Sequence, residues 1–186
     1  GENATMAFVE QLPKMTASGK VLLLESLAVR ADKAALPAVV TATNNSDTNV
    51  RATALKVLGV LGDARHVVQL AERAAKAKDD ERGAARQSLY RLRGANVDKT
   101  IVSNIAKADP GVKLELICSI NKRGISTAND VLLRTAKDAN SEVRLESFKA
   151  LKVSAEAEYL PKLVDLLIDV PDSELKEAEK TIIVVA

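Results

Sequence analysis

The sequence has few of the residues on which most binding and catalytic chemistry depends. Among 186 residues there is no tryptophan, and phenylalanine and tyrosine occur twice each. Aromatic side chains stack on bases and wall the pockets of base-removing glycosylases, so their scarcity argues against both kinds of site. The single cysteine, Cys118, excludes an internal disulfide. The single histidine, His66, and Cys118 are too few for a zinc site without several carboxylate ligands.

Charge imbalance and long apolar runs are also missing. The 27 lysines and arginines nearly balance 25 aspartates and glutamates, which leaves a net charge of +2. Such a balance predicts a mixed, solvated surface and not the positive field of a dedicated nucleic-acid-binding protein. No apolar run approaches the roughly 18 residues that a membrane-spanning helix needs. The sequence also has no phosphate-binding glycine loop, dinucleotide fingerprint or nucleophile elbow. We therefore expect no catalytic residue, no metal site and no cofactor.

What the sequence does contain is an internal repeat, with a period of about 31 residues. Leu36-Pro37 reappears four periods later as Leu160-Pro161. Steps of one period give one column of apolar residues at Val39, Leu70, Ile101, Leu132 and Leu163. A second column consists of Leu27, Leu58, Leu89, Ile120, Leu151 and Ile182. A fixed period of this length is typical of a solenoid, in which each unit packs mainly on its neighbours.

The second repeat shows why each unit should be a pair of helices. Asp47 precedes apolar residues at helical spacing, from Val50 to Leu61, and can cap the first turn of a helix. Gly62 should end this helix in a left-handed conformation. The preceding helix is expected over residues 33–43, where Pro37 falls in the tolerated first turn.

These motifs resemble the HEAT repeat, in the short bacterial version also seen in phycobilin lyases. The resemblance rests on Asp-x-x-Val-Arg at residues 47–51 and Leu-Gly-x-Leu-Gly at residues 58–62. It implies an all-α, right-handed α-α superhelix of about six helix pairs, forming a single domain over residues 1–186. First helices would lie on the convex face, and second helices would line the concave face.

Two helices depart from the pattern. Glu81 takes the place of Val50 in the third repeat, and Gly83 interrupts the first turn, so we expect a frayed or shifted helix start there. In the last helix, Leu175 fits the column of Val50 only after a one-residue insertion.

Basic residues also recur once in each period, at Lys20, Arg51, Arg82, Lys113 and Arg144. One hypothesis is a cationic rail for an anionic partner. We favour a structural ladder, in which each base pairs with an acid of its own or the next repeat, such as Asp47 with Arg51, because closely spaced like charges need neutralising. The HEAT resemblance implies such a ladder too.

A second set of basic residues has a better claim on a ligand. Helical spacing directs them away from the apolar stripe, onto the concave face, where they would form a strip interleaved with Glu115 and Glu146: Lys56, Arg91, Lys122 and Lys149. The competing interpretation is an ordinary solvated helix face. Cys118 is expected to be a small, largely buried thiol.

The leading hypothesis for function is a non-catalytic scaffold that binds a protein segment or an adjacent domain on its concave face. A second hypothesis is nucleic-acid binding through the basic strip, against which the interleaved acids argue. Two more hypotheses are an enzyme, such as a lyase or a glycosylase, and a spacer in a larger extracytoplasmic enzyme. We expect a monomer. We also expect a fragment of a longer protein, because the leading glycine resembles a cleavage scar and the chain ends within an apolar run. The compartment is not fixed by the sequence, although the resemblance is compatible with an exported bacterial protein.

Overall fold

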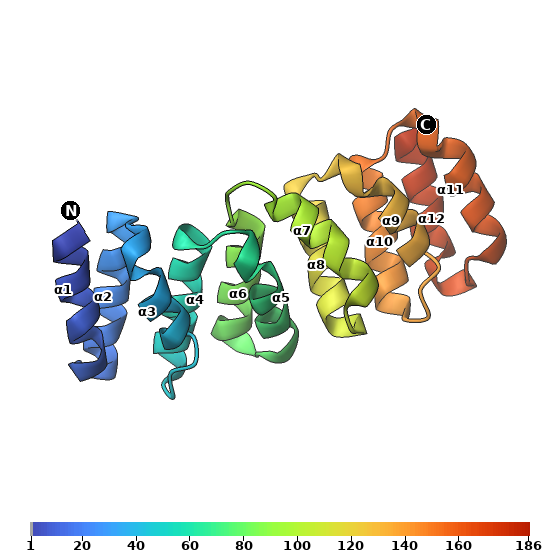
Figure 1. Ribbon diagram of the computed structural model, residues 1–186. Coiled ribbons are helices and arrows are strands. Elements are labelled where there is room, and N and C mark those ends of the chain that lie inside the picture. The colour runs from blue at the N-terminus through green and yellow to red at the C-terminus, as the bar shows by residue number, and fades with distance from the viewer. Residues whose placement is uncertain (1) are drawn as a thin grey trace. The chain divides into compact units, whose positions relative to one another are not determined.

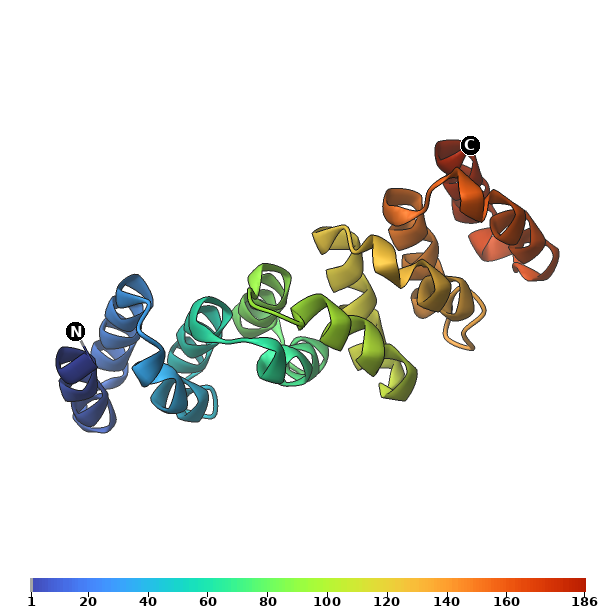
Figure 2. The same ribbon diagram turned by 45° about the horizontal axis from the view of Figure 1, so that its top comes forward.

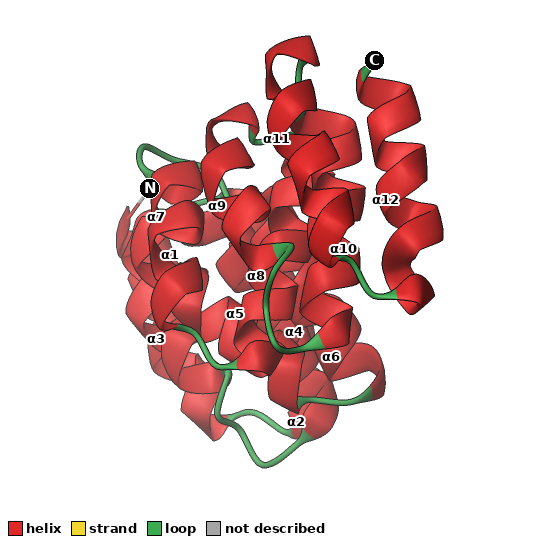
Figure 3. Cartoon of the chain, turned by 90° about the vertical axis from the view of Figure 1, so that its right-hand side faces the viewer, coloured by secondary structure: helices red, strands yellow, loops and turns green. Residues whose placement is uncertain are grey.

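The computed structural model describes residues 2–186, and every regular element in that range is a helix (Figure 3). Twelve α-helices form six successive pairs, and short 3₁₀ turns precede or extend several of them. The predicted fold class, an all-α array of HEAT-like helix pairs, is therefore confirmed. The chain divides into two compact units, one ending at Val97 and the other spanning Asp98–Ala186.

The first unit contains three helix pairs (Figure 1). Its first helices are α1 (Glu2–Gln11), α3 (Leu36–Ala42) and α5 (Val67–Lys76). Its second helices are α2 (Ala17–Arg30), α4 (Thr48–Leu61) and α6 (Asp79–Arg91). The second helices pack directly on one another, with α4 between α2 and α6.

The second unit repeats this arrangement. Its first helices are α7 (Val97–Asn104), which begins at the boundary, α9 (Asn129–Thr135) and α11 (Leu160–Leu166). Its second helices are α8 (Pro110–Arg123), α10 (Ser141–Ser154) and α12 (Asp172–Val185), and α10 packs between the other two. Figure 2 shows these three helices following one another from yellow through orange to red.

The two apolar columns form the core. Every residue of the column from Val39 to Leu163 is fully buried, and so are the first five residues of the column from Leu27 to Leu151. Only Ile182, the last residue of that column, is partly exposed. The constant period therefore places aliphatic side chains where successive helices meet, which is the packing expected of a repeat protein.

The helix starts follow the predicted capping chemistry. The Asp47 carboxylate accepts hydrogen bonds from the backbone N–H groups of Asn49 and Val50, at 2.9 and 3.0 Å. Asp109 and Asn140 cap α8 and α10 in the same way. These side chains satisfy amide groups that have no partner within the helix.

Gly62 does not have the left-handed conformation that we predicted. Its φ and ψ angles are −73° and 178°, so the backbone is extended. Glycine is needed for a different reason, since a Cβ atom here would lie 2.5 Å from the carbonyl oxygen of Leu58. Left-handed helix ends occur instead at Ala31 after α2, where φ is 52°, and at Gly124 after α8, where φ is 64°.

A second glycine permits close packing of α4 on α6. A Cβ atom added to Gly59 would lie 2.7 Å from Cβ of Ser88 and 2.8 Å from its Cα. Gly83, on the outer side of α6, would meet nothing within 4 Å. The two glycines are therefore a matched pair, one required by packing and the other not.

We predict opposite effects of alanine at these two positions. Gly83→Ala should raise the free energy of unfolding by roughly 0.5–1 kcal/mol, because alanine is the better helix former. Gly59→Ala should lower it by about 1–3 kcal/mol, because α4 and α6 would have to move apart. Urea denaturation measures both values, and a stabilised Gly59→Ala variant would contradict the close approach of the helices.

Candidate functional site

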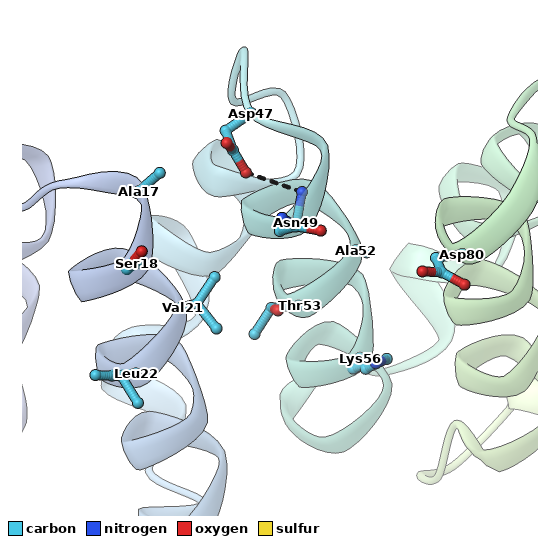
Figure 4. Close-up of a pocket in the computed structure, with 10 residues that line it drawn as sticks. All are labelled: Ala17, Ser18, Val21, Leu22, Asp47, Asn49, Ala52, Thr53, Lys56 and Asp80. Carbon is cyan, nitrogen blue, oxygen red and sulfur yellow. Dashed lines mark hydrogen bonds between the residues drawn. The ribbon is translucent and has the colours of Figure 1, made fainter.

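The exposed face of the second helices in the first unit contains a hollow of about 520 Å³ (Figure 4). Its apolar lining comes from Val21 and Leu22 on α2 and from Ala52 on α4. Its charged groups are Asp47, Lys56 and, from the start of α6, Asp80. The ten residues that line the hollow are Ala17, Ser18, Val21, Leu22, Asp47, Asn49, Ala52, Thr53, Lys56 and Asp80. The lining thus combines aliphatic surface with charges of both signs.

Exposed apolar residues lie on the same face. Leu22 is 66% exposed, and further along α2 and α4, Val29 and Val60 are 88% and 56% exposed. Arg91 is exposed in the equivalent position of α6. This face therefore exposes three aliphatic side chains and one cation that core packing does not require.

The four predicted ligand-binding cations fall into two groups. Lys56, Arg91 and Lys122 are exposed, and none of them pairs with a carboxylate in the part of the chain that the structure describes. Lys149 is half-buried, and its ammonium lies 3.2 Å from the carboxylate of Glu146. Lys56 and Arg91 belong to the first unit, and Lys122 and Lys149 belong to the second.

In the second unit, acids occupy the face that the basic strip was predicted to cover. Glu146 also accepts a hydrogen bond from the Asn121 amide at 3.2 Å, which links α8 to α10. Lys152 donates a hydrogen bond to Glu177, which links α10 to α12. This hydrogen bond lowers the pKa of Glu177 below its usual value. Of the two predicted cations in this unit, Lys149 is therefore neutralised by an acid of its own helix, whereas Lys122 has no such partner among the described residues.

The ladder residue Arg51 pairs with the next repeat and not with Asp47. Its guanidinium lies 2.9 Å from the carboxylate of Glu81 and also donates to the backbone carbonyls of Asn45 and Ser46. Arg73 contacts the other oxygen of Glu81 at 3.1 Å. The hydrogen bond to Glu81 raises the pKa of Arg51.

The same arrangement recurs in the second unit. Arg144 donates two hydrogen bonds to Glu174, at 2.9 and 3.1 Å, and two more to the carbonyls of Asp138 and Ala139. Arg51 and Glu81 are 30 residues apart, and so are Arg144 and Glu174. The two pairs fill the same position of the repeat, although Arg51 contacts one oxygen of its glutamate and Arg144 contacts both.

The predictions about the two departing helices had different outcomes. Helix α6 begins at Asp79 without a shift in register, but its start is irregular, because Asp79 has a left-handed φ of 46° and no side chain caps the helix. Glu81 is buried near this start, where it binds Arg51 and Arg73. Glu174, not Leu175, occupies the column of Val50, with no insertion. A glutamate can replace the buried valine because an arginine of the preceding repeat neutralises it.

The other ladder residues differ from one another. Lys113 pairs with Asp138 of the following turn, at 2.6 Å. Burial would raise the pKa of Asp138, but the hydrogen bonds from Lys113 and the Asn140 backbone lower it below its usual value. Arg82 is half-buried on α6. Lys20 is half-buried on α2, and no carboxylate of the described residues pairs with it.

The remaining reactive residues have structural positions. His66 accepts a hydrogen bond from the Asp63 backbone N–H and completes a capping box with that residue. Cys118 is half-buried on α8. Across residues 2–186, no group of three or more histidine, cysteine or acidic residues could hold a metal ion. No described helix combines the length and apolar character that a membrane crossing requires.

Comparisons with known proteins agree with this architecture. The model of the family described as HEAT repeats matches residues 6–90 and 99–182, so the chain belongs to the HEAT repeat family. No curated protein is similar to the chain in sequence.

Several solved structures share the fold. The MAST/Orbit N-terminal domain is 18% identical, with 94% of each chain covered and a TM-score of 0.65. An engineered protein is also 18% identical, with 98% of this chain and 96% of the other covered, at a TM-score of 0.51. The phycocyanin lyase complex of CpcE and CpcF from Nostoc sp. PCC7120 is 16% identical over 99% of each chain, at a TM-score of 0.40. At these identities the first two similarities concern the fold alone, and the third, at a TM-score of 0.40, supports no conclusion.

We predict that the buried Arg144–Glu174 pair stabilises the second unit. Glu174→Gln should lower the free energy of unfolding by about 1–3 kcal/mol, because it leaves the Arg144 charge without its carboxylate. Glu179→Gln is the matched control, since it removes an exposed carboxylate from the same helix. Equal stability of the two variants in urea denaturation would show that the pair contributes nothing.

The lowered pKa of Asp138 predicts a loss of stability in acid. Its pKa is lower in the folded protein than the usual 3.8, so its contribution is present above this pH and is lost as the pH falls. Asp138→Asn should therefore cost about 1 kcal/mol at pH 7 and much less at pH 3. Urea denaturation at several pH values measures this difference. Asp169→Asn, which removes an exposed partner of Lys137, should have little effect at either pH.

Proposed function

We propose that this chain is a non-catalytic protein-interaction module that binds a segment of another protein, or of a neighbouring domain, on the exposed face of its second helices. The observation that carries the proposal is the hollow between α2 and α4 in the first unit. Leu22 at its edge is an exposed aliphatic residue, and Lys56 is an exposed cation with no acidic partner among the described residues. Neither residue has a role in the core.

The lining of the hollow suits a peptide. In Figure 4, the side chains of Val21 and Thr53 lie between α2 and α4, and Asp47 and Asp80 lie toward the helix starts. Aliphatic side chains of a bound segment could bury against Val21 and Leu22. Basic and acidic side chains of the segment could then pair with Asp80 and Lys56, respectively, which would fix its direction.

Nucleic acid fits this surface less well. The hollow is lined by two aspartates and a single lysine, and the two aspartates would repel a phosphate backbone. In the second unit, Glu146 and Glu177 already neutralise neighbouring lysines. We therefore propose protein and not nucleic acid as the partner. The four cations Lys56, Arg91, Lys122 and Lys149 remain the proposed contacts to acidic groups of that partner.

Selection of peptides from a random displayed library tests the proposal directly. Peptides selected on the wild-type chain should bind the Leu22→Asp and Lys56→Glu variants at least about tenfold more weakly. The burial of a leucine side chain alone contributes enough free energy for a change of this size. Lys99→Glu in α7 is the control, since it reverses an exposed charge on a first helix. Failure to select any peptide, or equal binding by all variants, would refute the site.

A further inference from the structure

A second hollow in the first unit lies beside Lys20, on the side where first helices turn into second helices. It has a volume of about 360 Å³ and is formed by α1, α3 and the beginnings of α2 and α4. Apart from Lys20, Thr41 and Asn45, its lining is apolar: Val9, Leu12, Pro13, Ala38, Ala42 and Val50. Lys20 is half-buried, so its alkyl stem can lie along this aliphatic lining while its ammonium stays at the edge of the hollow.

The other ladder residues show which partner this position requires. Where the next repeat has a glutamate in the column of Val50, the glutamate binds the ladder arginine, as in Arg51–Glu81 and Arg144–Glu174. Where the next repeat has a valine, an acid of the turn can take over, as it does at Lys113. Arg82 is also followed by a valine, Val112, but Lys107 occupies its turn position. Lys113 is followed by Val143 in the next repeat, and its ammonium binds Asp138.

Lys20 has neither partner among the described residues. The next repeat has the buried Val50 in that column, so no glutamate is available there. Asn45, which is uncharged, occupies the turn position that is equivalent to Asp138. Asn45 keeps the local turn, because its side-chain oxygen accepts a hydrogen bond from Asp47 N–H at 3.0 Å, as Asp138 accepts one from Asn140 N–H at 2.9 Å. The turn is thus retained, and only the negative charge is missing.

We propose that this hollow binds a segment of a partner protein that carries a glutamate next to an aliphatic residue. The glutamate would supply to Lys20 the carboxylate that the chain itself supplies to Arg51, Lys113 and Arg144. The aliphatic neighbour would bury against the apolar lining between α1 and α3. This inference rests on the proposed function in one respect, since the occupant is a protein segment, but the site is separate from the hollow beside Lys56.

Two variants of the first unit distinguish this site from a general basic surface. Lys20→Glu reverses the charge. Asn45→Asp adds the missing acid in the place that Asp138 has in the second unit, so it should pair with Lys20 internally and leave the backbone turn unchanged. Lys14→Glu reverses an exposed lysine of the same repeat and serves as the control.

The test uses synthetic peptides with a central Leu-Glu-Leu or Leu-Gln-Leu in a short glycine–serine background, titrated by NMR chemical shift. The wild-type chain and Lys14→Glu should bind the glutamate peptide about threefold to tenfold more tightly than the glutamine peptide. Perturbed signals should come from residues around Lys20 and Asn45. Both Lys20→Glu and Asn45→Asp should lose the preference, and Asn45→Asp should also resist urea better than the wild type.

Different results would overturn the inference. These are equal binding of the two peptides, absence of binding, a preference that persists in Asn45→Asp, or perturbations confined to the Lys56 hollow. Octanoate, a free aliphatic carboxylate, is titrated in the same way. If it binds as tightly as the glutamate peptide, the hollow would be a site for small molecules and not for a protein segment. The library selection with Leu22 and Lys56 variants does not use these peptides, so failure here is distinguishable from failure of the proposed function.

Discussion

Each unit depends on direct packing of its second helices against one another through aliphatic side chains. The sequence offers almost no aromatic residues to fill space, so the helices must lie close together to exclude water. The contact between Gly59 and Ser88 shows how close α4 and α6 lie, because there is no room for a methyl group between them. Once this inner layer is fixed, the period of the repeat sets which side chains of adjacent repeats meet.

The ladder follows from that period. Within each unit, a base in one second helix lies near the first turn of the next second helix, and the residue there influences which acid the base pairs with. Glutamate gives a buried ion pair, as at Glu81 and Glu174, whereas valine adds to the core, and at Val143 it leaves Lys113 to an acid in the turn. Buried ion pairs often contribute little net stability compared with apolar contacts. The ion pairs are present in only some repeats, as expected if this position tolerates either a glutamate with an arginine partner or a valine in the core.

Much of the fold was predictable from the sequence, because period and capping are local signals. The columns from Val39 and from Leu27, and the caps at Asp47, Asp109 and Asn140, needed only spacing and residue type. The errors arose where a contact between repeats overrides a local rule. Glu81 and Glu174 contradict an apolar column, and only the arginine 30 residues earlier explains them. That arginine was visible in the sequence, so a search for acids 30 residues after each base would have found both pairs.

The candidate sites were harder to predict, because a site depends on what a position lacks. Lys56 was identified from helical spacing, but the hollow beside it depends on the relative depth of α2 and α4, which no periodicity specifies. Lys20 is identical in pattern to the other ladder bases and differs only in its surroundings, where valine and asparagine replace the two acids. In a repeat protein, a charged side chain with a purely structural role finds its partner within the protein in every unit. A position that one unit leaves unsatisfied, with its local turn intact, is where a partner can complete the pattern.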